Sequence, residues 1–298
     1  MSLSIQEYQE IIQPTLFTRA PLESQGIHED LKGHVQLLAV MGDDLTIVNA
    51  AKVSFYSEAT AWGDDCTRLI KYLAKHKHFS PFEHASLTFR IKTYLPIAKQ
   101  HMRHRTQSYN EISRRYTSEN IEFHIPQVFR KQAKKNKQGS EGQLDEEANA
   151  VALEIVTKLA SQSLEAYEAL LMLGVCKEQA RGYLIQATYT EYWATANLRN
   201  WLQYLDLRLD EHAQQEIREV ALCIYEMIKK RFPFACEAWE LANQNTYAIE
   251  MLHLDLEALK RLACTLWEAQ PINWALLDMV LNQINAKKEN QNERATND

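Results

Sequence analysis

The chain has 298 residues, of which 46% are hydrophobic and 24% are charged, as expected for a soluble globular protein of one or two domains. Its formal net charge of −6 argues against a general affinity for nucleic acids or membrane surfaces. No apolar run reaches the roughly 18 residues of a membrane span. The N-terminus also lacks the charged-then-apolar order of a signal peptide, so we expect a cytoplasmic protein.

The secondary structure predicted from the sequence alternates between helical and strand periods. Helices are predicted over residues 64–76, 96 to about 103, 146–173, 198 to about 208, 210 to about 230, and 252–285. Two strands are predicted, over 86–93, where apolar and polar residues alternate, and over 188–196, which is rich in threonine and aromatic residues.

Local signals indicate where several of these helices begin. Asp64, Asn197 and Asp210 are candidate N-caps, and Pro96 suits the first turn of a short helix. In the helix over 146–173, apolar residues recur in register at Val151, Ile155 and Leu159. Residues 131–147 have almost no large apolar side chains, which predicts a mobile surface insertion.

These elements indicate the α+β class, with an antiparallel sheet flanked by helices. A Rossmann sheet is disfavoured, because no GxGxxG motif occurs and the chain has only 8 glycines. The five cysteines are widely spaced without a Cys-x-x-Cys pair, so the sequence predicts neither a disulfide framework nor a metal site.

Residues 103–116, RHRTQSYNEISRRY, concentrate positive charge in this acidic chain. Four arginines and one histidine surround Glu111. Arginine presents a planar fork of donors that phosphates accept bidentately, so the segment suits a site for more than one anionic group. The alternatives are a solvated basic face and a nucleic-acid patch, although a patch of that kind usually recruits more lysines and a wider basic surface.

Within this segment, Arg103-His104-Arg105, seven further residues and Ser113 resemble the RHR-x7-S signature of the flavin-dependent thymidylate synthases. Flanking segments over 41–55, 78–89 and 178–218 are similar to that family in the same order. The resemblance implies a mixed α/β domain and a homotetramer with active sites between subunits. It also implies conversion of dUMP to dTMP, with methylenetetrahydrofolate as carbon donor, reduced FAD as hydride donor and NADPH as the reductant of the flavin.

The resemblance further implies a set of ligand contacts. The implied dUMP contacts are Gln100, Arg103, Glu111, Ile112, Ser113, Arg114, Arg115, Arg181 and Arg208. The implied FAD contacts are Ser80, Arg103, His104, Arg105, Glu111, Asn197, Arg199 and Gln203. Arg208 is the implied catalytic residue, since a permanent cation stabilises the uracil ring deprotonated at N3. Ser113 is expected to form hydrogen bonds rather than to act as a nucleophile, which would need an adjacent base.

Some positions depart from the family pattern or keep two interpretations. Arg114 stands where a small residue is common, and Gln203 stands where an asparagine is common. His78, His84 and His212 lie in the matched segments. For each of them, a structural hydrogen bond is at least as well supported as a catalytic role.

The resemblance also suggests a domain organisation: an N-terminal extension over 1–37, the main domain over 38–240, and a helical C-terminal extension over 241–298 with a disordered tail. Two alternatives to the enzyme stay open at this point. One is a non-enzymatic protein that binds a nucleotide or RNA through the basic segment, and the other is an inactive homologue that binds flavin.

Overall fold

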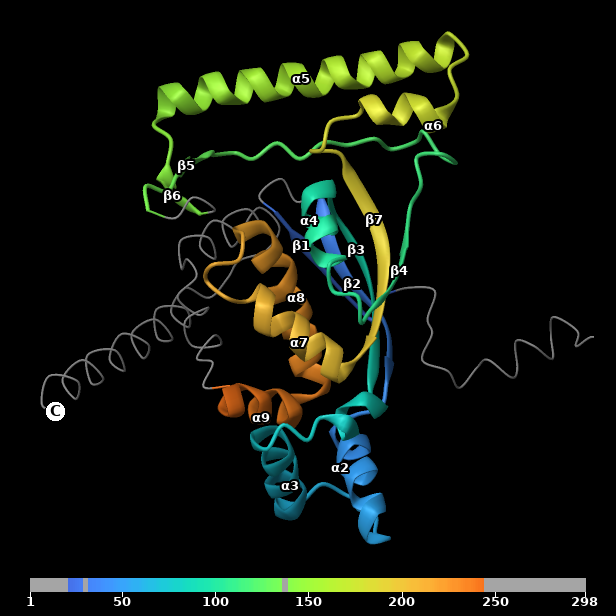
Figure 1. Ribbon diagram of the computed structural model, residues 1–298, viewed down its shortest axis with the longest axis vertical. Helices are drawn as coiled ribbons and strands as arrows, with labels where there is room; N and C mark the ends of the chain where they lie inside the picture. The colour runs from blue at the N-terminus through green and yellow to red at the C-terminus, as the bar shows by residue number, and fades with distance from the viewer. Residues whose placement is uncertain (1–20, 29–31, 136–138, 244–298) are drawn as a thin grey trace, which may run out of the picture. The chain divides into compact units, whose positions relative to one another are not determined.

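The computed structural model describes residues 21–28, 32–135 and 139–243 (Figure 1). Its main feature is an antiparallel sheet of five strands in the order β1-β2-β3-β7-β4. The strands are β1 Glu23–Ile27, β2 Gly33–Met41, β3 Ser86–Tyr94, β4 Ser108–Glu111 and β7 Tyr189–Asn197. The α+β class is thereby confirmed, and both predicted strands are found within one residue of their expected bounds.

The core lies between this sheet and three helices that cover one of its faces (Figure 1). These helices are α4 Leu95–His101, α7 Leu198–Arg208 and α8 Gln215–Arg231. The alternating residues Leu87, Phe89 and Ile91 of β3 are all buried. Trp201 of α7 is fully buried, packs edge-on against Phe89, and donates its indole N–H to the Leu87 carbonyl at 3.1 Å. That bond satisfies the one polar atom of the indole, so the ring is buried at no hydrogen-bonding cost.

A second group of helices packs at one end of the sheet. It consists of α2 Asp44–Lys52, the 3-10 turns η1 Val53–Phe55 and η2 Ser80–His84, α3 Asp64–Lys75, and α9 Pro233–Asn243. Asp44 joins α2 to the start of α9, because its buried carboxylate accepts hydrogen bonds from the backbone N–H groups of Phe234 and Ala235 at 3.1 and 2.8 Å. These are donors of the first turn of α9, which have no partner inside their own helix.

Two of the three predicted helix caps were wrong. The N-cap of α3 is Gly63, in extended backbone, and Asp64 is the first helical residue, where its charge still favours the helix dipole. Helix α8 begins only at Gln215, because Asp210 accepts a hydrogen bond from the N–H of His212 at 2.8 Å and so stabilises a turn. The third cap is confirmed: Asn197 Oδ1 accepts from the N–H of Asn200 at 3.0 Å.

The long helix α5, Glu146–Met172, is confirmed and is capped by Asp145. The aligned residues Val151, Ile155 and Leu159 are 54%, 61% and 49% exposed, so the described residues leave about half of this stripe uncovered. Two shorter elements adjoin α5, namely α6 Lys177–Ala180 and the 3-10 turn η3 Arg181–Tyr183.

The predicted insertion over 131–147 is partly a hairpin, formed by β5 Arg130–Gln132 and β6 Ser140–Gln143. Residues 146 and 147 already belong to α5. The mobility of this insertion stays a prediction.

The proposed domain boundaries at residues 38 and 240 stay predictions. Strand β1 and the first half of β2 belong to the sheet, because β1 pairs with β2 from Glu23↔Leu37 to Ile27↔Gly33. All described residues fall in one compact unit, Met1–Asn245. The helix predicted over 252–285 and the polar tail lie outside the described residues. Within the described part of the chain, none of the helices combines the length and apolar character that a membrane crossing requires.

The Asp44 cap gives a testable stability effect. Burial raises the pKa of Asp44 to about 6, although its two backbone donors lower it. The folded state then holds this proton more tightly than the unfolded chain, so the stability tied to Asp44 falls as the pH rises from 3.8 to about 6. We expect Asp44→Ala to lower the free energy of unfolding by about 1–3 kcal/mol near pH 5.

Urea unfolding of the wild type and Asp44→Ala at pH 5 and pH 7 measures this effect. The difference between the two proteins should be smaller at pH 7, and exposed Asp65→Ala in α3 is the matched control. A difference that is constant or grows with pH would contradict the assignment.

Candidate functional site

The segment 103–116, here called the arginine loop, is held to the sheet by the buried side chain of His101. The Nε2–H of His101 donates to Gln107 Oε1 at 3.0 Å, which leaves Nδ1 to accept from the Tyr192 hydroxyl at 2.8 Å. The Tyr109 hydroxyl lies 3.0 Å from the carbonyl oxygens of both His101 and His104 and shares its hydrogen between them. Strand β4 within the loop pairs with β7. The start of the loop therefore has a fixed path.

His101 is neutral at physiological pH. Burial lowers its pKa to about 3, outweighing the hydrogen bond to Gln107. Its ring stacks on Tyr204 of α7 at a centroid distance of 4.3 Å. Since Tyr192 lies in β7, this one imidazole joins α4, β7 and α7.

Arg208, at the end of α7, is bound to neutral acceptors only. Its Nε donates to His104 Nε2 at 2.9 Å, and its Nη2 donates to the Gln100 carbonyl at 3.2 Å. Burial and then the charge of Arg208 lower the pKa of His104 to about 4, so this imidazole accepts as a neutral base. No carboxylate among the described residues pairs with Arg208, and its positive charge is left for an anionic ligand.

Two further predicted residues are positioned beside this cluster. The side-chain amide of Gln100 donates from Nε2 to Gln214 Oε1 at 2.6 Å. Glu111, at the end of β4, accepts at Oε1 from the hydroxyl of Thr190 at 2.6 Å.

The second half of the arginine loop lies against α6 instead. Arg115 forms an ion pair with Glu178 at 3.0 Å, and Lys177 donates to the Tyr116 carbonyl at 3.3 Å. Arg114 binds the backbone carbonyls of Glu119 and Asn120. These contacts give Arg114 a structural role within its own loop. In the family that the sequence resembles, a small residue is common at this position.

Ser113 has no catalytic partner in the described part of the chain. Its hydroxyl accepts from the N–H of Arg115 at 3.3 Å, and no described imidazole or carboxylate contacts it. Ile112, next to it, is 41% exposed. Arg181 opens η3, which directly follows α6.

The remaining predicted residues gather where α7 meets η2. Arg199 pairs with Glu83 of η2, Ser80 begins that turn, and Gln203 is exposed on α7. The side-chain oxygen Oδ1 of Asn197 caps α7, which leaves the side-chain NH2 group of Asn197 to donate elsewhere. Of the three histidines with two interpretations, His78 packs edge-on against Tyr72, His84 is exposed, and His212 contacts Asp210 at 3.0 Å.

Among the predicted site residues, three arginines are exposed and have no side-chain hydrogen bond or ion pair with any described residue: Arg103, Arg105 and Arg181. Exposed arginines without a carboxylate partner are suited to bind a ligand with several negative charges. Arg103 and Arg105 flank His104, so this donor set fits a diphosphate such as that of FAD.

The predicted residues thus form separate groups within one chain. Gln100, His104 and Arg208 are joined by hydrogen bonds, whereas Arg115 is bound to α6. No hydrogen bond or ion pair among the described residues links these two groups.

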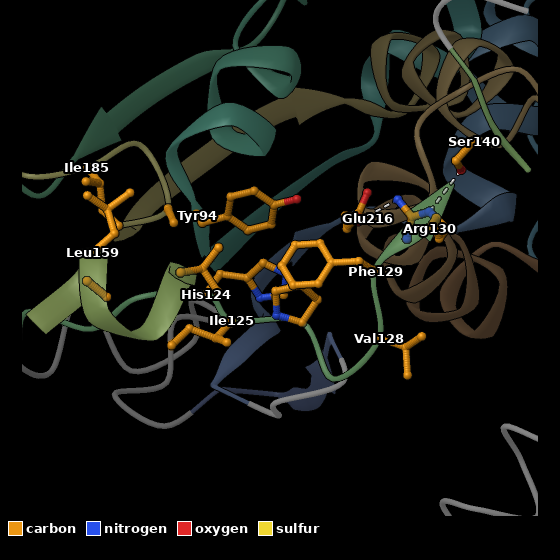
Figure 2. Close-up of a pocket in the computed structure, with 14 residues that line it drawn as sticks. Tyr94, His124, Ile125, Val128, Phe129, Arg130, Ser140, Leu159, Ile185 and Glu216 are labelled. Atoms are coloured by element: carbon orange, nitrogen blue, oxygen red, sulfur yellow. Dashed lines mark hydrogen bonds and ion pairs between the residues drawn. The ribbon is translucent and has the colours of Figure 1, made fainter. Parts of the chain in front are cut away.

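A cavity of about 460 Å³ is lined by none of the predicted site residues (Figure 2). Tyr94 and His124 stack in its wall at 4.4 Å, and Arg130 pairs with Glu216 at 2.7 Å. Burial raises the pKa of Glu216, but the hydrogen bond and charge of Arg130 outweigh it, and the pKa is lowered. Glu216 therefore stays ionised.

Sequence reasoning missed the residues that hold the candidate site residues in place by hydrogen bonds and ring contacts. These are His101, Gln107, Tyr109, Tyr192, Tyr204 and Gln214. The only local signal was the position of His101, one helical turn before His104. The partners of His101 in β7 and α7 are about a hundred residues away in the chain.

The low pKa of His104 is directly measurable. We expect NMR titration of His104 in the wild type to show a midpoint near 4, so that it is neutral from pH 6 to 8. Arg208→Ala removes the repulsive charge but not the burial, and should raise this pKa while leaving it below 6.5. Exposed Arg68→Ala is the control. A wild-type midpoint at 6.5 would contradict the geometry.

Comparison with known proteins agrees with the resemblance found in the sequence. The model of the family described as thymidylate synthase complementing protein matches residues 36–234. The chain is 47% identical over 210 residues to a flavin-dependent thymidylate synthase of Thermus thermophilus, covering 70% of this chain and 76% of the relative. It is 39% identical over 208 residues to one of Thermosipho africanus, covering 70% and 91%.

A solved structure has the same fold. The UMP/dUMP methylase PolB of Streptomyces cacaoi, crystallised with 5-Br dUMP, aligns with a TM-score of 0.66 at 30% identity, covering 73% of this chain and 97% of PolB. The family predicted from the sequence is confirmed. This chain belongs to the thymidylate synthase complementing protein family, whose relatives include the flavin-dependent thymidylate synthases.

Proposed function

We propose that this protein is a flavin-dependent thymidylate synthase, which methylates dUMP to dTMP with methylenetetrahydrofolate as carbon donor. The names of its relatives and the dUMP methylase activity in the name of PolB support this reaction. The observation that carries the proposal is Arg208, a cation whose partners among the described residues are a neutral imidazole and a backbone carbonyl. A charge so placed stabilises negative charge that develops on a uracil ring.

The chain's own residues divide the binding work. Arg103 and Arg105 bind the diphosphate of FAD, which when bound supplies the hydride and is itself reduced by NADPH. Asn197, Gln203 and Ser80, near the start of α7, hold the rest of that cofactor. Gln100 and Arg208 hold the pyrimidine.

The phosphate of dUMP is bound by the second half of the arginine loop and by η3. Ser113 donates a hydrogen bond there, and Arg115 and Arg181 supply charge. Glu111 lies between the two ligands.

We assign these two groups of residues to different protomers of a homotetramer. The support is that no hydrogen bond or ion pair joins the Arg208 cluster to the Arg115–Glu178 pair within the described residues. The apolar stripe on α5 is exposed in one chain and suits an interface. We further propose a cytoplasmic enzyme that takes folate as its second substrate.

Turnover tests the reaction. Release of tritium from [5-³H]dUMP in the presence of FAD, NADPH and methylenetetrahydrofolate is expected for the wild type. Arg208→Ala should reduce kcat by roughly 100- to 1,000-fold, the cost of losing one oriented charge donor. Arg68→Ala, in exposed helix α3, should retain full activity. Absence of tritium release by the wild type would contradict the proposal and favour a non-enzymatic nucleotide-binding protein.

Subunit mixing tests the composite site. Arg208→Ala and Arg181→Ala are each expected to be inactive. If one site takes Arg208 and Arg181 from different protomers, random co-assembly leaves about one quarter of the sites intact. Mixed oligomers, isolated by two different affinity tags, should therefore recover about a quarter of wild-type activity. Mixed oligomers without any recovery would place both arginines in the same protomer.

A further inference from the structure

A series of hydrogen bonds leads from the cavity of Figure 2 to Gln100 of α4, just before the arginine loop. Arg130 donates to Glu216 Oε1 at 2.7 Å, and Gln214 Nε2 donates to Glu216 Oε2 at 2.8 Å. Gln100 Nε2 then donates to Gln214 Oε1 at 2.6 Å. Both carboxylate oxygens of Glu216 and both ends of the Gln214 amide are thus occupied.

The direction of these bonds is fixed by chemistry. Arginine only donates and an ionised carboxylate only accepts. Gln214 must therefore present its NH2 group to Glu216, which directs its carbonyl oxygen at Gln100. Gln100 in turn must present its NH2 group to Gln214. The ion pair at the cavity wall determines the orientation of an amide four residues before His104.

The outward end of Gln100 is consequently a carbonyl oxygen. Gln100 Oε1 has no hydrogen-bond partner among the described residues, and the side chain is partly exposed. The backbone of Gln100 is fixed as well, since its carbonyl accepts from Arg208 at 3.2 Å. A glutamine held at both its backbone and its amide has lost most of its conformational freedom before any ligand binds.

We propose that Gln214 is a positioning residue, which with Glu216 and Arg130 holds Gln100 so that its carbonyl oxygen accepts a hydrogen bond from the bound nucleotide. The donor is a ring N–H or a sugar hydroxyl of dUMP. A freely rotating glutamine presents either its NH2 group or its oxygen, whereas the held one presents only the acceptor. This inference rests on the proposed function in one respect, the contact between Gln100 and dUMP.

Calorimetric titration of FAD-loaded protein with dUMP tests the proposal without turnover. Gln214→Met keeps the side-chain length and removes both amide groups, and we expect it to raise the Kd for dUMP by about 5- to 10-fold, the effect of one poorly oriented hydrogen bond. Glu216→Gln should raise it less, because its amide still accepts. The matched control is Gln215→Met, an exposed neighbour that binds Glu219 instead and should leave the Kd unchanged.

A double-mutant cycle separates positioning from general damage to α8. In a Gln100→Met background the side chain to be positioned is gone, so Gln214→Met should have no further effect on the Kd. The same fold increase in both backgrounds would overturn the proposal, as would an unchanged Kd in Gln214→Met. If Gln100→Met itself leaves the Kd unchanged, the contact between Gln100 and dUMP in the proposed function is wrong, and the positioning role falls with it.

Discussion

The buried hydrogen bonds of His101 are the constraint on which the rest of the site depends. A neutral imidazole donates to Gln107 and accepts from Tyr192, and it stacks on Tyr204. These contacts tie the end of α4 to strand β7, between β3 and β4 in the sheet, and to helix α7. Because a buried polar group without a partner costs about 1–3 kcal/mol, Gln107 and Tyr192 are held in place as the partners of the two ring nitrogens of His101. The arginine loop therefore starts from a rigid base.

The second constraint is electrostatic, because an acidic protein must keep positive charge available at this site. The chain is acidic overall, yet its proposed ligands are anions. Carboxylates close to Arg208 would neutralise it, and the structure places a neutral histidine and a carbonyl there instead. Acidic residues do pair with two other predicted arginines, Glu178 with Arg115 and Glu83 with Arg199. The distribution of charge, rather than its sum, fits the proposed function.

Local patterns in the sequence predicted the local structure well. Alternation in residues 86–93 predicted β3, and Asn197 was recognised as the cap of α7. The arginine loop stands out as a candidate site because its charge opposes that of the chain. Patterns that depend on distant partners were not predicted. Strand β1, Glu23–Ile27, has little apolar alternation and forms a strand because β2 is available to pair with it.

The sequence also did not predict the helix caps at Gly63 and Gln214, the partner of the apolar face of α5, or the hydrogen bonds that hold the candidate site residues. Asp64 and Asp210 carry a capping side chain, but the local backbone places Gly63 and Gln214 at the caps. The period of α5 predicts an apolar stripe but not what covers it. The hydrogen bonds of His101, and the series from Arg130 to Gln100, connect residues up to about a hundred positions apart, and only the fold brings them together.

The visible absorption spectrum of the FAD-loaded protein during titration with dUMP tests the central claim most directly. The claim is that two anionic ligands, FAD and dUMP, are bound side by side by the arginines of one site. The account predicts that the flavin bands shift and that the shift saturates at one dUMP per FAD. A protein that takes up no FAD, or whose flavin spectrum is unchanged by saturating dUMP, would contradict it.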